Sequence, residues 1–264
     1  MHILKIIGLV LTGAGLALAA GALFLFSLFQ APKLIAGWIP GSVAGKIGLH
    51  GVALAGPATA ACNEGAGADA LLRILDRLQS GGSYGRRFQL HIVGGDMENA
   101  FALPGRHIVL VSGLIRRAKA PEEVAAVLAH EMGHGLENDP EALFLRNIGV
   151  TVLFKFLRRD DDSAAAFRAM LSQLRYSRDA ERSADAHAVA ILRRARIGAK
   201  PAGEFILRSA AESPAGESVM SDLGAYPTAE ERAAFFLAQP TYPTEPILSE
   251  EEWAAARAVC GAAR

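Results

Sequence analysis

The sequence contains only two cysteines in 264 residues, Cys62 and Cys260. Two cysteines are too few for a disulfide framework, and without a C-x-x-C pair they indicate neither a zinc knuckle nor a thiol redox site. Connectivity cannot be read from one sequence. The two residues therefore form either one disulfide, which an exported protein would allow, or two unrelated thiols.

The sequence also lacks an excess of charge of either sign, since 27 Lys and Arg balance 27 Asp and Glu. No tract interleaves basic and aromatic residues, so we expect no nucleic-acid partner. Internal repeats are absent as well. The length allows one or two domains of roughly 100–200 residues, and we interpret the chain as one soluble domain behind an anchor.

The chain does contain one long apolar run near its N-terminus. No charged residue lies between Lys5 and Lys33, and Ile6–Phe29 is long enough as a helix to cross about 30 Å of hydrocarbon. This run predicts a single-pass membrane anchor. The alternative is a cleaved signal peptide with a small-x-small site at Ala17-Leu18-Ala19, although signal cores usually hold about 7–15 apolar residues. The flanking lysines do not fix the orientation by themselves, and we expect the following domain on the periplasmic or extracytoplasmic side.

The remaining patterns predict an α+β fold that is mainly α-helical, with a small β-sheet. Residues 31–66 are rich in Pro, Gly and Ala, which is typical of a connecting segment with a short helix. An amphipathic helix from Asp69 ends at Gly81-Gly82, and strands are expected from Phe88 and over Arg106 to Ser112. We divide the chain into 1–30, anchor or signal sequence; 31–66, connecting segment; 67–240, catalytic domain; and 241–264, C-terminal helical tail.

Four helices are predicted in the second half of the chain. Pro121 opens the first, because its missing amide is not needed there. A long helix is expected from Ser163 to Gly198, after a solvent-exposed charge run at Arg158 to Asp162. Capping boxes then start two short helices. These boxes are Thr228 with Glu231 and Ser249 with Glu252.

The helix that Pro121 opens carries His130-Glu131-Met132-Gly133-His134. Spacing of i to i+4 brings both imidazoles to one face, where a single metal ion can meet both nitrogens. Glu131 points to the adjacent face, from which it can reach a water molecule on the metal without being a ligand. The pattern is that of a zincin with Glu131 as general base.

A catalytic zinc site needs a third protein ligand, and the long helix supplies Glu181. Small residues at Ala180, Ala184 and Ala188 would let that helix approach the first one closely. The alternative is a solvated charge stripe on a surface helix, which includes Asp185. His91, His107 and His187 are expected to be packed or surface residues, because three ligands are already assigned.

Three ordered motifs resemble the gluzincins of the HtpX-like and CAAX-prenyl-protease-like type, which include BepA-type periplasmic proteases. These motifs are Asn99 to Gly105 before a strand, Glu123 to His134 around the zinc motif, and Tyr176-Ser177-Arg178 leading into Glu181 and Asp185. The resemblance implies one zinc ion on His130, His134 and Glu181, Glu131 as general base, and a proton-relay or ligand-orienting role for Asp185. It also implies a zincin-like domain that holds an extended peptide along a strand edge, which we place at Arg106 to Ser112.

Two positions depart from the family pattern. Tyr226-Pro227 stands where many relatives carry His-Pro, so a histidine latch on the zinc is not expected. Tyr226 is instead a candidate transition-state stabiliser that donates a hydrogen bond to the oxyanion, or else a buried structural tyrosine. Arg106 stands where a second glycine is usual.

The sequence thus predicts a zinc-dependent metalloendopeptidase that acts on protein or peptide substrates in protein quality control at a membrane. The alternative is a membrane-tethered, zinc-binding chaperone or assembly factor with little proteolysis. A deformylase-type hydrolase is not expected, because neither cysteine lies in the context of a zinc ligand.

Overall fold

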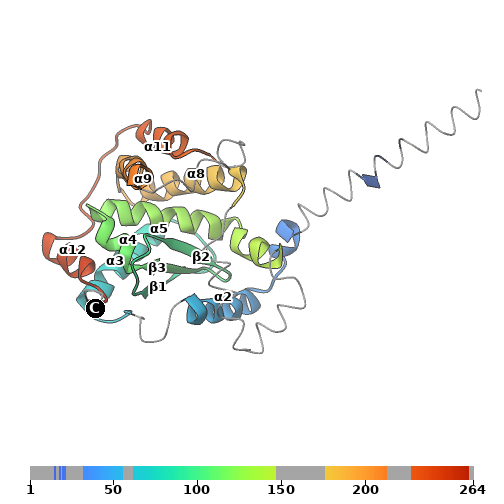
Figure 1. Cartoon of the computed structure of the whole chain (residues 1–264), viewed down its shortest axis with the longest axis horizontal. Helices are drawn as coiled ribbons and strands as arrows, with labels where there is room; N and C mark the ends of the chain where they lie inside the picture. The colour runs from blue at the N-terminus through green and yellow to red at the C-terminus, as the bar shows by residue number, and fades with distance from the viewer. Residues whose placement is uncertain are drawn as a thin grey trace, which may run out of the picture.

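The computed structural model describes residues 32–55, 62–146, 176–212 and 227–261, together with positions 15, 18, 20 and 21. Helices surround one small sheet, so the fold is α+β and mainly helical, as predicted (Figure 1). The predicted span Ile6–Phe29 lies, apart from those four positions, outside the described residues. Within the described part, no helix has the length and apolar character needed to cross a membrane. The charge run at Arg158 to Asp162 also lies outside the described part.

Three strands form the sheet in the order β1-β3-β2. β1 (Gln89–Val93) pairs in parallel with β3 (His107–Val111), and β2 (Ala100–Leu103) pairs with β3 in antiparallel fashion. The two predicted strands are confirmed. The sequence did not reveal β2 as a strand, because all four of its residues are buried and no polar alternation marks it.

Helices cover both faces of the sheet. α3 (Ala66–Ser80) and α5 (Pro121–Leu136) share a core with the side chains of one face, as the pattern of alternate residues requires. α2 (Gly41–Ala55) packs through Ile47 on the other face. The apolar residues of that second face are Val93, Phe101, Leu103, Val109 and Val111.

Residues 31–66 were expected to form a connecting segment with a short helix, and within them α2 forms a layer of the fold. Its glycines permit a close approach to the sheet: a methyl group at Gly48 would lie 1.9 Å from the carbonyl oxygen of Pro104 and 2.5 Å from Cδ2 of His107. The sequence pattern treats such glycines as helix breakers, whereas here they allow the helix to pack.

α8 (Arg178–Arg194), α9 (Lys200–Glu212) and α11 (Ala229–Leu237) lie on the side of α5 that faces away from the sheet (Figure 1). Ser163, the predicted start of the long helix, lies outside the described residues. The helix is not continuous from there to Gly198, because Ser177 is extended and its side chain accepts a hydrogen bond from the amide of Ala180. That N-cap begins α8 at Arg178. The helix also ends before Gly198, since Arg196 takes a left-handed conformation with φ of 55°.

The C-terminal helix α12 (Glu250–Arg257) packs against α3, and both predicted capping boxes are present.

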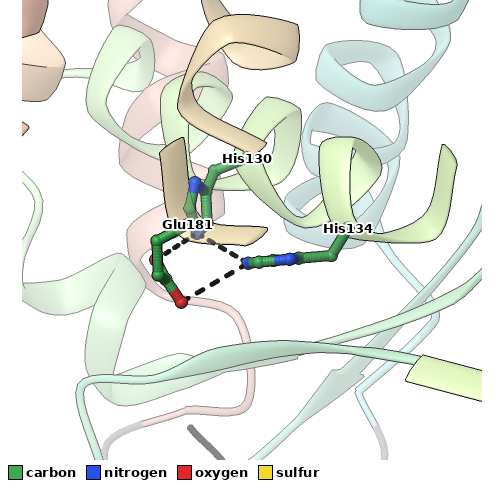
Figure 2. A group of neighbouring side chains, drawn as sticks. All are labelled: His130, His134 and Glu181. Atoms are coloured by element: carbon green, nitrogen blue, oxygen red, sulfur yellow. Dashed lines mark hydrogen bonds and ion pairs between the residues drawn. The ribbon is translucent and has the colours of Figure 1, made fainter. Parts of the chain in front are cut away.

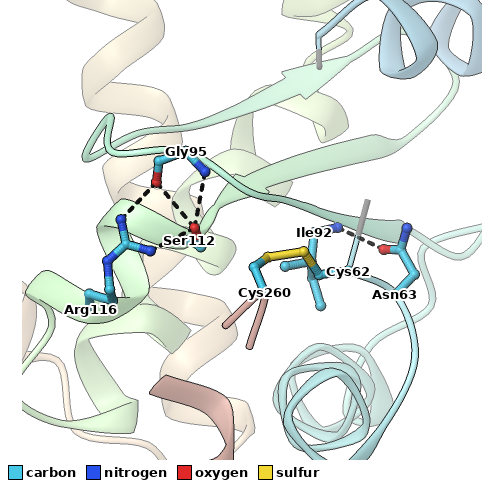
Figure 3. Close-up of a disulfide and its surroundings, with 7 residues drawn as sticks. All are labelled: Cys62, Asn63, Ile92, Gly95, Ser112, Arg116 and Cys260. Atoms are coloured by element: carbon cyan, nitrogen blue, oxygen red, sulfur yellow. Dashed lines mark hydrogen bonds between the residues drawn. A yellow bond between two sulfur atoms is a disulfide. The ribbon is translucent and has the colours of Figure 1, made fainter. Parts of the chain in front are cut away.

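A disulfide joins Cys62 to Cys260 with a Cα–Cα distance of 5.2 Å, which resolves the alternative left by the sequence (Figure 3). Next to it, the amide of Cys62 donates a hydrogen bond to the carbonyl oxygen of Ile92, and the amide of Ile92 donates one to the side-chain oxygen of Asn63. Beyond the sheet, α4 (Ser112–Arg117) leads from β3 towards α5.

Candidate metal centre and active site

α5 and α8 cross at close range because small residues line the contact. A methyl group at Gly133 would lie 2.7 Å from the carbonyl oxygen and 2.8 Å from Cα of Ala184. Ala184 and Ala188 are fully buried. The predicted close approach is therefore confirmed, and it brings the beginning of α8 to the two histidines of α5.

The crossing gathers His130, His134 and Glu181 around one point (Figure 2). The two Nε2 atoms face each other at 3.1 Å, and the carboxylate of Glu181 lies 3.4 Å from Nε2 of His130 and 3.7 Å from Nε2 of His134. One ligand atom from each residue lies within 4.8 Å of the others. Two imidazole nitrogens and a carboxylate oxygen form the donor set of a catalytic zinc site, which leaves a fourth position open.

The other ring nitrogen of each histidine contacts a carboxylate. Nδ1 of His130 lies 2.9 Å from Asp185, and Nδ1 of His134 lies 3.1 Å from Asp139. Such carboxylates fix the tautomer and the ring orientation of a metal ligand. Tyr176 stacks on the ring of His134 at a centroid distance of 3.8 Å, which restricts that ring further.

Asp185 was predicted at the site, but Asp139 and two basic neighbours were not. Arg232 of α11 binds Asp185, and Lys33 lies 3.1 Å from Asp139. No spacing rule connects either base with the zinc motif, because both contacts join segments far apart in the sequence. The one available signal was that Arg232 follows Tyr226-Pro227 in the motif that departs from the family pattern.

The carboxylates around His130 control its charge in the metal-free protein. Burial and Arg232 lower the pKa of His130, but the hydrogen bonds to Asp185 and Glu181 outweigh them and raise it to about 9. Burial opposes ionisation of Asp185, yet the hydrogen bonds from Arg232 and His130 hold its pKa at about 2. The pKa of Glu181 is lowered against burial by its hydrogen bond to His130. Both carboxylates are therefore ionised at neutral pH.

Glu131 is buried and accepts a hydrogen bond of 2.7 Å from the backbone amide of Ala102. Burial raises the pKa of Glu131, while the nearby charges of His130 and His134 oppose that rise. A carboxylate with a raised pKa is suited to accept and return a proton near neutral pH.

The same hydrogen bond shows which strand borders the site. The amide of Ala102 points away from β3 and towards α5, so the outer edge of β2 faces the metal centre. The expectation that Arg106 to Ser112 supplies a free edge is wrong, because β3 is paired on both sides. β2 is therefore the edge strand that lies next to the candidate ligand group.

His91, His107 and His187 form contacts away from the ligand group. Nε2 of His91 lies 2.9 Å from Nδ1 of His107, and Nε2 of His187 lies 2.9 Å from Glu137. Tyr226 lies outside the described residues, so its role stays a prediction. Arg106 adopts a φ of 69°, a conformation that favours glycine, which explains why glycine suits this position.

The comparisons with known proteins agree with this geometry. Residues 70–250 of the chain match the sequence model of a protein family described as Peptidase family M48. A mitochondrial metalloendopeptidase OMA1 of Arabidopsis thaliana is 27% identical over 66% of this chain and 36% of its own length. A protease HtpX homolog of Chlorobium limicola is 31% identical over 52% of this chain and 60% of its own length. Another HtpX homolog, from Thermoplasma acidophilum, is 39% identical over 26% of this chain and 22% of its own length. The chain thus matches less than two thirds of each of these relatives.

Proposed function

Because the chain belongs to peptidase family M48, as its resemblance to HtpX-like proteases led us to expect, we propose that it is a zinc-dependent metalloendopeptidase. The observation that carries this proposal is the meeting of His130, His134 and Glu181 at one point, with Glu131 buried next to them. In this proposal the three residues bind one zinc ion.

The contacts of the histidines fit that assignment. Asp185 and Asp139 occupy the Nδ1 atoms, so both Nε2 atoms are left to face the Glu181 carboxylate. Bound zinc would supply Lewis acidity, which lowers the pKa of a water molecule to about 7 and polarises a carbonyl group. The residues of the chain must then bind the substrate and move protons.

Glu131 is the proposed general base. Its carboxylate removes a proton from the attacking water molecule and later delivers that proton to the leaving amine. Its hydrogen bond to Ala102 holds it between α5 and the β2 edge, where an extended peptide would lie. Asp185 orients His130 and is the partner of Arg232, and Tyr226 is the proposed donor to the oxyanion.

The proposed setting is a membrane, with the catalytic domain on the extracytoplasmic side. The apolar run Ile6–Phe29 supports an anchor, and the Cys62–Cys260 disulfide supports an oxidising compartment. The substrates in this proposal are unfolded or damaged proteins at that membrane. The disulfide is tested on chain isolated without reductant and treated with a thiol-reactive polymer. The polymer should attach to Cys62 and Cys260, and so slow the chain on a gel, only after the disulfide has been reduced.

The peptidase activity is tested on the full-length chain in detergent, with casein as substrate and the zinc content measured. Wild type and Glu131→Gln should hold equal zinc, and only wild type should release fragments. Glu122→Gln is the matched control, because it removes a carboxylate from the first turn of the same helix. Equal zinc without cleavage by wild type would favour the chaperone alternative, and folded wild type without zinc would overturn the ligand assignment.

A further inference from the structure

A cluster of large apolar side chains is exposed on the segment that precedes α3. Trp38 is 88% exposed, and the others in this cluster are between 44% and 65% exposed. All of them lie within residues 34–49. The cluster consists of Leu34, Ile35, Trp38, Val43 and Leu49. Exposed apolar side chains concentrated in one short stretch of the sequence make that segment a candidate interaction surface.

The two faces of α2 differ in what they contact. Its buried residues include Ala44, Ile47 and Gly48, which lie against the sheet. Its outer face combines apolar side chains with a lysine. The exposed residues of that face are Ser42, Val43, Lys46, Leu49 and Ala53. This face therefore offers apolar contacts, one positive charge and no negative charge to whatever surface covers it.

The charges of the segment favour a lipid surface over a protein partner of mixed charge. Residues 32–55 contain no Asp or Glu, and their basic residues are Lys33 and Lys46. Lys33 is paired with Glu137 and Asp139, so Lys46 is the charge of this segment that faces outward. The segment itself adds no carboxylate that would repel anionic headgroups. Tryptophan is enriched at the boundary between hydrocarbon and water, which suits the exposure of Trp38.

The position of the segment in the chain also favours a lipid surface. Residue 32 lies three positions after the end of the apolar run Ile6–Phe29. We propose that the exposed face of residues 34–53 lies in the headgroup layer of the bilayer, so that the domain rests on the membrane as well as being anchored to it. This inference rests on the membrane setting of the proposed function.

The same segment also reaches the metal centre. Lys33 lies 3.1 Å from Asp139, whose other oxygen lies 3.1 Å from Nδ1 of His134. The proposed lipid-facing segment and a candidate zinc ligand are thus joined by two polar contacts. Docking of this face fixes the centre close to the membrane surface.

The test uses the full-length chain in lipid nanodiscs that contain phosphatidylglycerol and brominated phosphatidylcholine, which quenches tryptophan at short range. The chain has two tryptophans, so Trp253→Phe isolates Trp38, and Trp38→Phe isolates Trp253 on α12. Bromination should reduce the emission of Trp38 to about half or less and leave that of Trp253 unchanged. Trp38 could be quenched merely because it lies close to the anchor in the sequence. A control therefore places a single tryptophan on α2, as Leu49→Trp in a chain that lacks both native tryptophans. Its matched variant is Met97→Trp, at a site that is exposed to a similar degree.

Quenching at Leu49→Trp but not at Met97→Trp is the expected result. Shielding of Leu49→Trp from acrylamide without quenching by brominated lipid would mean that protein, from this chain or a second copy, covers the face, and it would overturn the proposal. Equal quenching at both positions, or none at either, would overturn it as well. Casein cleavage is read separately, so failure of the lipid contact and failure of the peptidase assignment are distinguishable.

Discussion

Arg232 binds the carboxylate of Asp185 with two hydrogen bonds, from Nε to Oδ2 at 2.9 Å and from Nη2 to Oδ1 at 2.7 Å. Asp185 in turn contacts Nδ1 of His130 at 2.9 Å. A planar guanidinium that holds a carboxylate through two bonds fixes its direction better than an ammonium group can. Arg232 also lies 3.2 Å from Nδ1 of His130 and 3.5 Å from Glu181. It therefore acts on the candidate zinc ligands both through Asp185 and directly.

Replacing Arg232 should weaken zinc binding. Arg232→Met leaves the Asp185 carboxylate without its partner, and we expect zinc affinity to fall by about 10-fold to 100-fold. Arg232→Lys should recover part of the loss, since lysine restores the positive charge but cannot form the two parallel hydrogen bonds. Competition with a chromogenic chelator measures the affinity. Arg196→Gln is the control, because Arg196 forms an exposed ion pair with Glu245 far from the centre. Unchanged affinity in Arg232→Met would contradict the positioning role.

Zinc binding should release a proton from His130. The pKa of His130 in the metal-free protein is raised to about 9 by its carboxylate partners, whereas a ligand must be deprotonated at Nε2. Affinity should therefore rise by up to about tenfold per pH unit between about pH 6 and 9. Titration calorimetry in buffers with different ionisation enthalpies counts the protons. Asp185→Asn should flatten the dependence, and a flat profile in wild type would refute this charge assignment.

The close crossing of α5 and α8 predicts that Gly133→Ala is destabilising. The added methyl group would meet the backbone of Ala184, which cannot move without shifting α8. We expect a net loss of about 1–2 kcal/mol, because overpacking outweighs the gain in helix propensity. Thermal unfolding and zinc content report the effect. Gly198→Ala is the control, since the nearest atom to its methyl group would be 3.8 Å away. A Gly133→Ala protein as stable as wild type would show that the helices can separate freely.

The pair of His91 and His107 predicts a loss of stability in mild acid. Burial and the charge of His107 lower the pKa of His91 from 6.5 to about 4. The unfolded chain then binds more protons between these two values, so the contribution of His91 is complete above about pH 6.5 and is lost as the pH falls towards 4. His91→Gln removes the imidazole that takes up a proton on unfolding, and it should make the melting temperature less sensitive to pH. Parallel slopes for the two proteins from about pH 7 to 5 would exclude His91 as the cause.

The sequence predicted the elements whose signals are local. The zinc motif, the Pro121 helix start and the Thr228 and Ser249 capping boxes depend on residues within one or two turns, and all of these signals lie within the described residues. The ligand group was also within reach, because i to i+4 spacing fixes two histidines and zinc chemistry demands a third ligand. The domain boundaries and the roles of the site residues remain predictions.

The parts that the sequence did not reveal depend on contacts between distant segments. Arg232 and Lys33 reach the site from different ends of the chain, and no periodicity marks either residue. β2 is buried on both sides and shows no alternation, so the edge strand was placed one strand away. The N-cap at Ser177 competed with the apolar pattern before it, and the local hydrogen bond to Ala180 set the start of α8.

The bond between Cys62 and Cys260 spans a sequence separation of 198 residues and so encloses α5, α8 and the candidate ligands in one covalent ring. A cut anywhere within that ring opens it without releasing a fragment. A chain nicked by itself or by another protease would therefore keep its mass and its metal ligands together until the disulfide is reduced. Processing at one internal loop would separate fragments only on a reducing gel, so a form of this protein that is cleaved once can remain one covalent molecule.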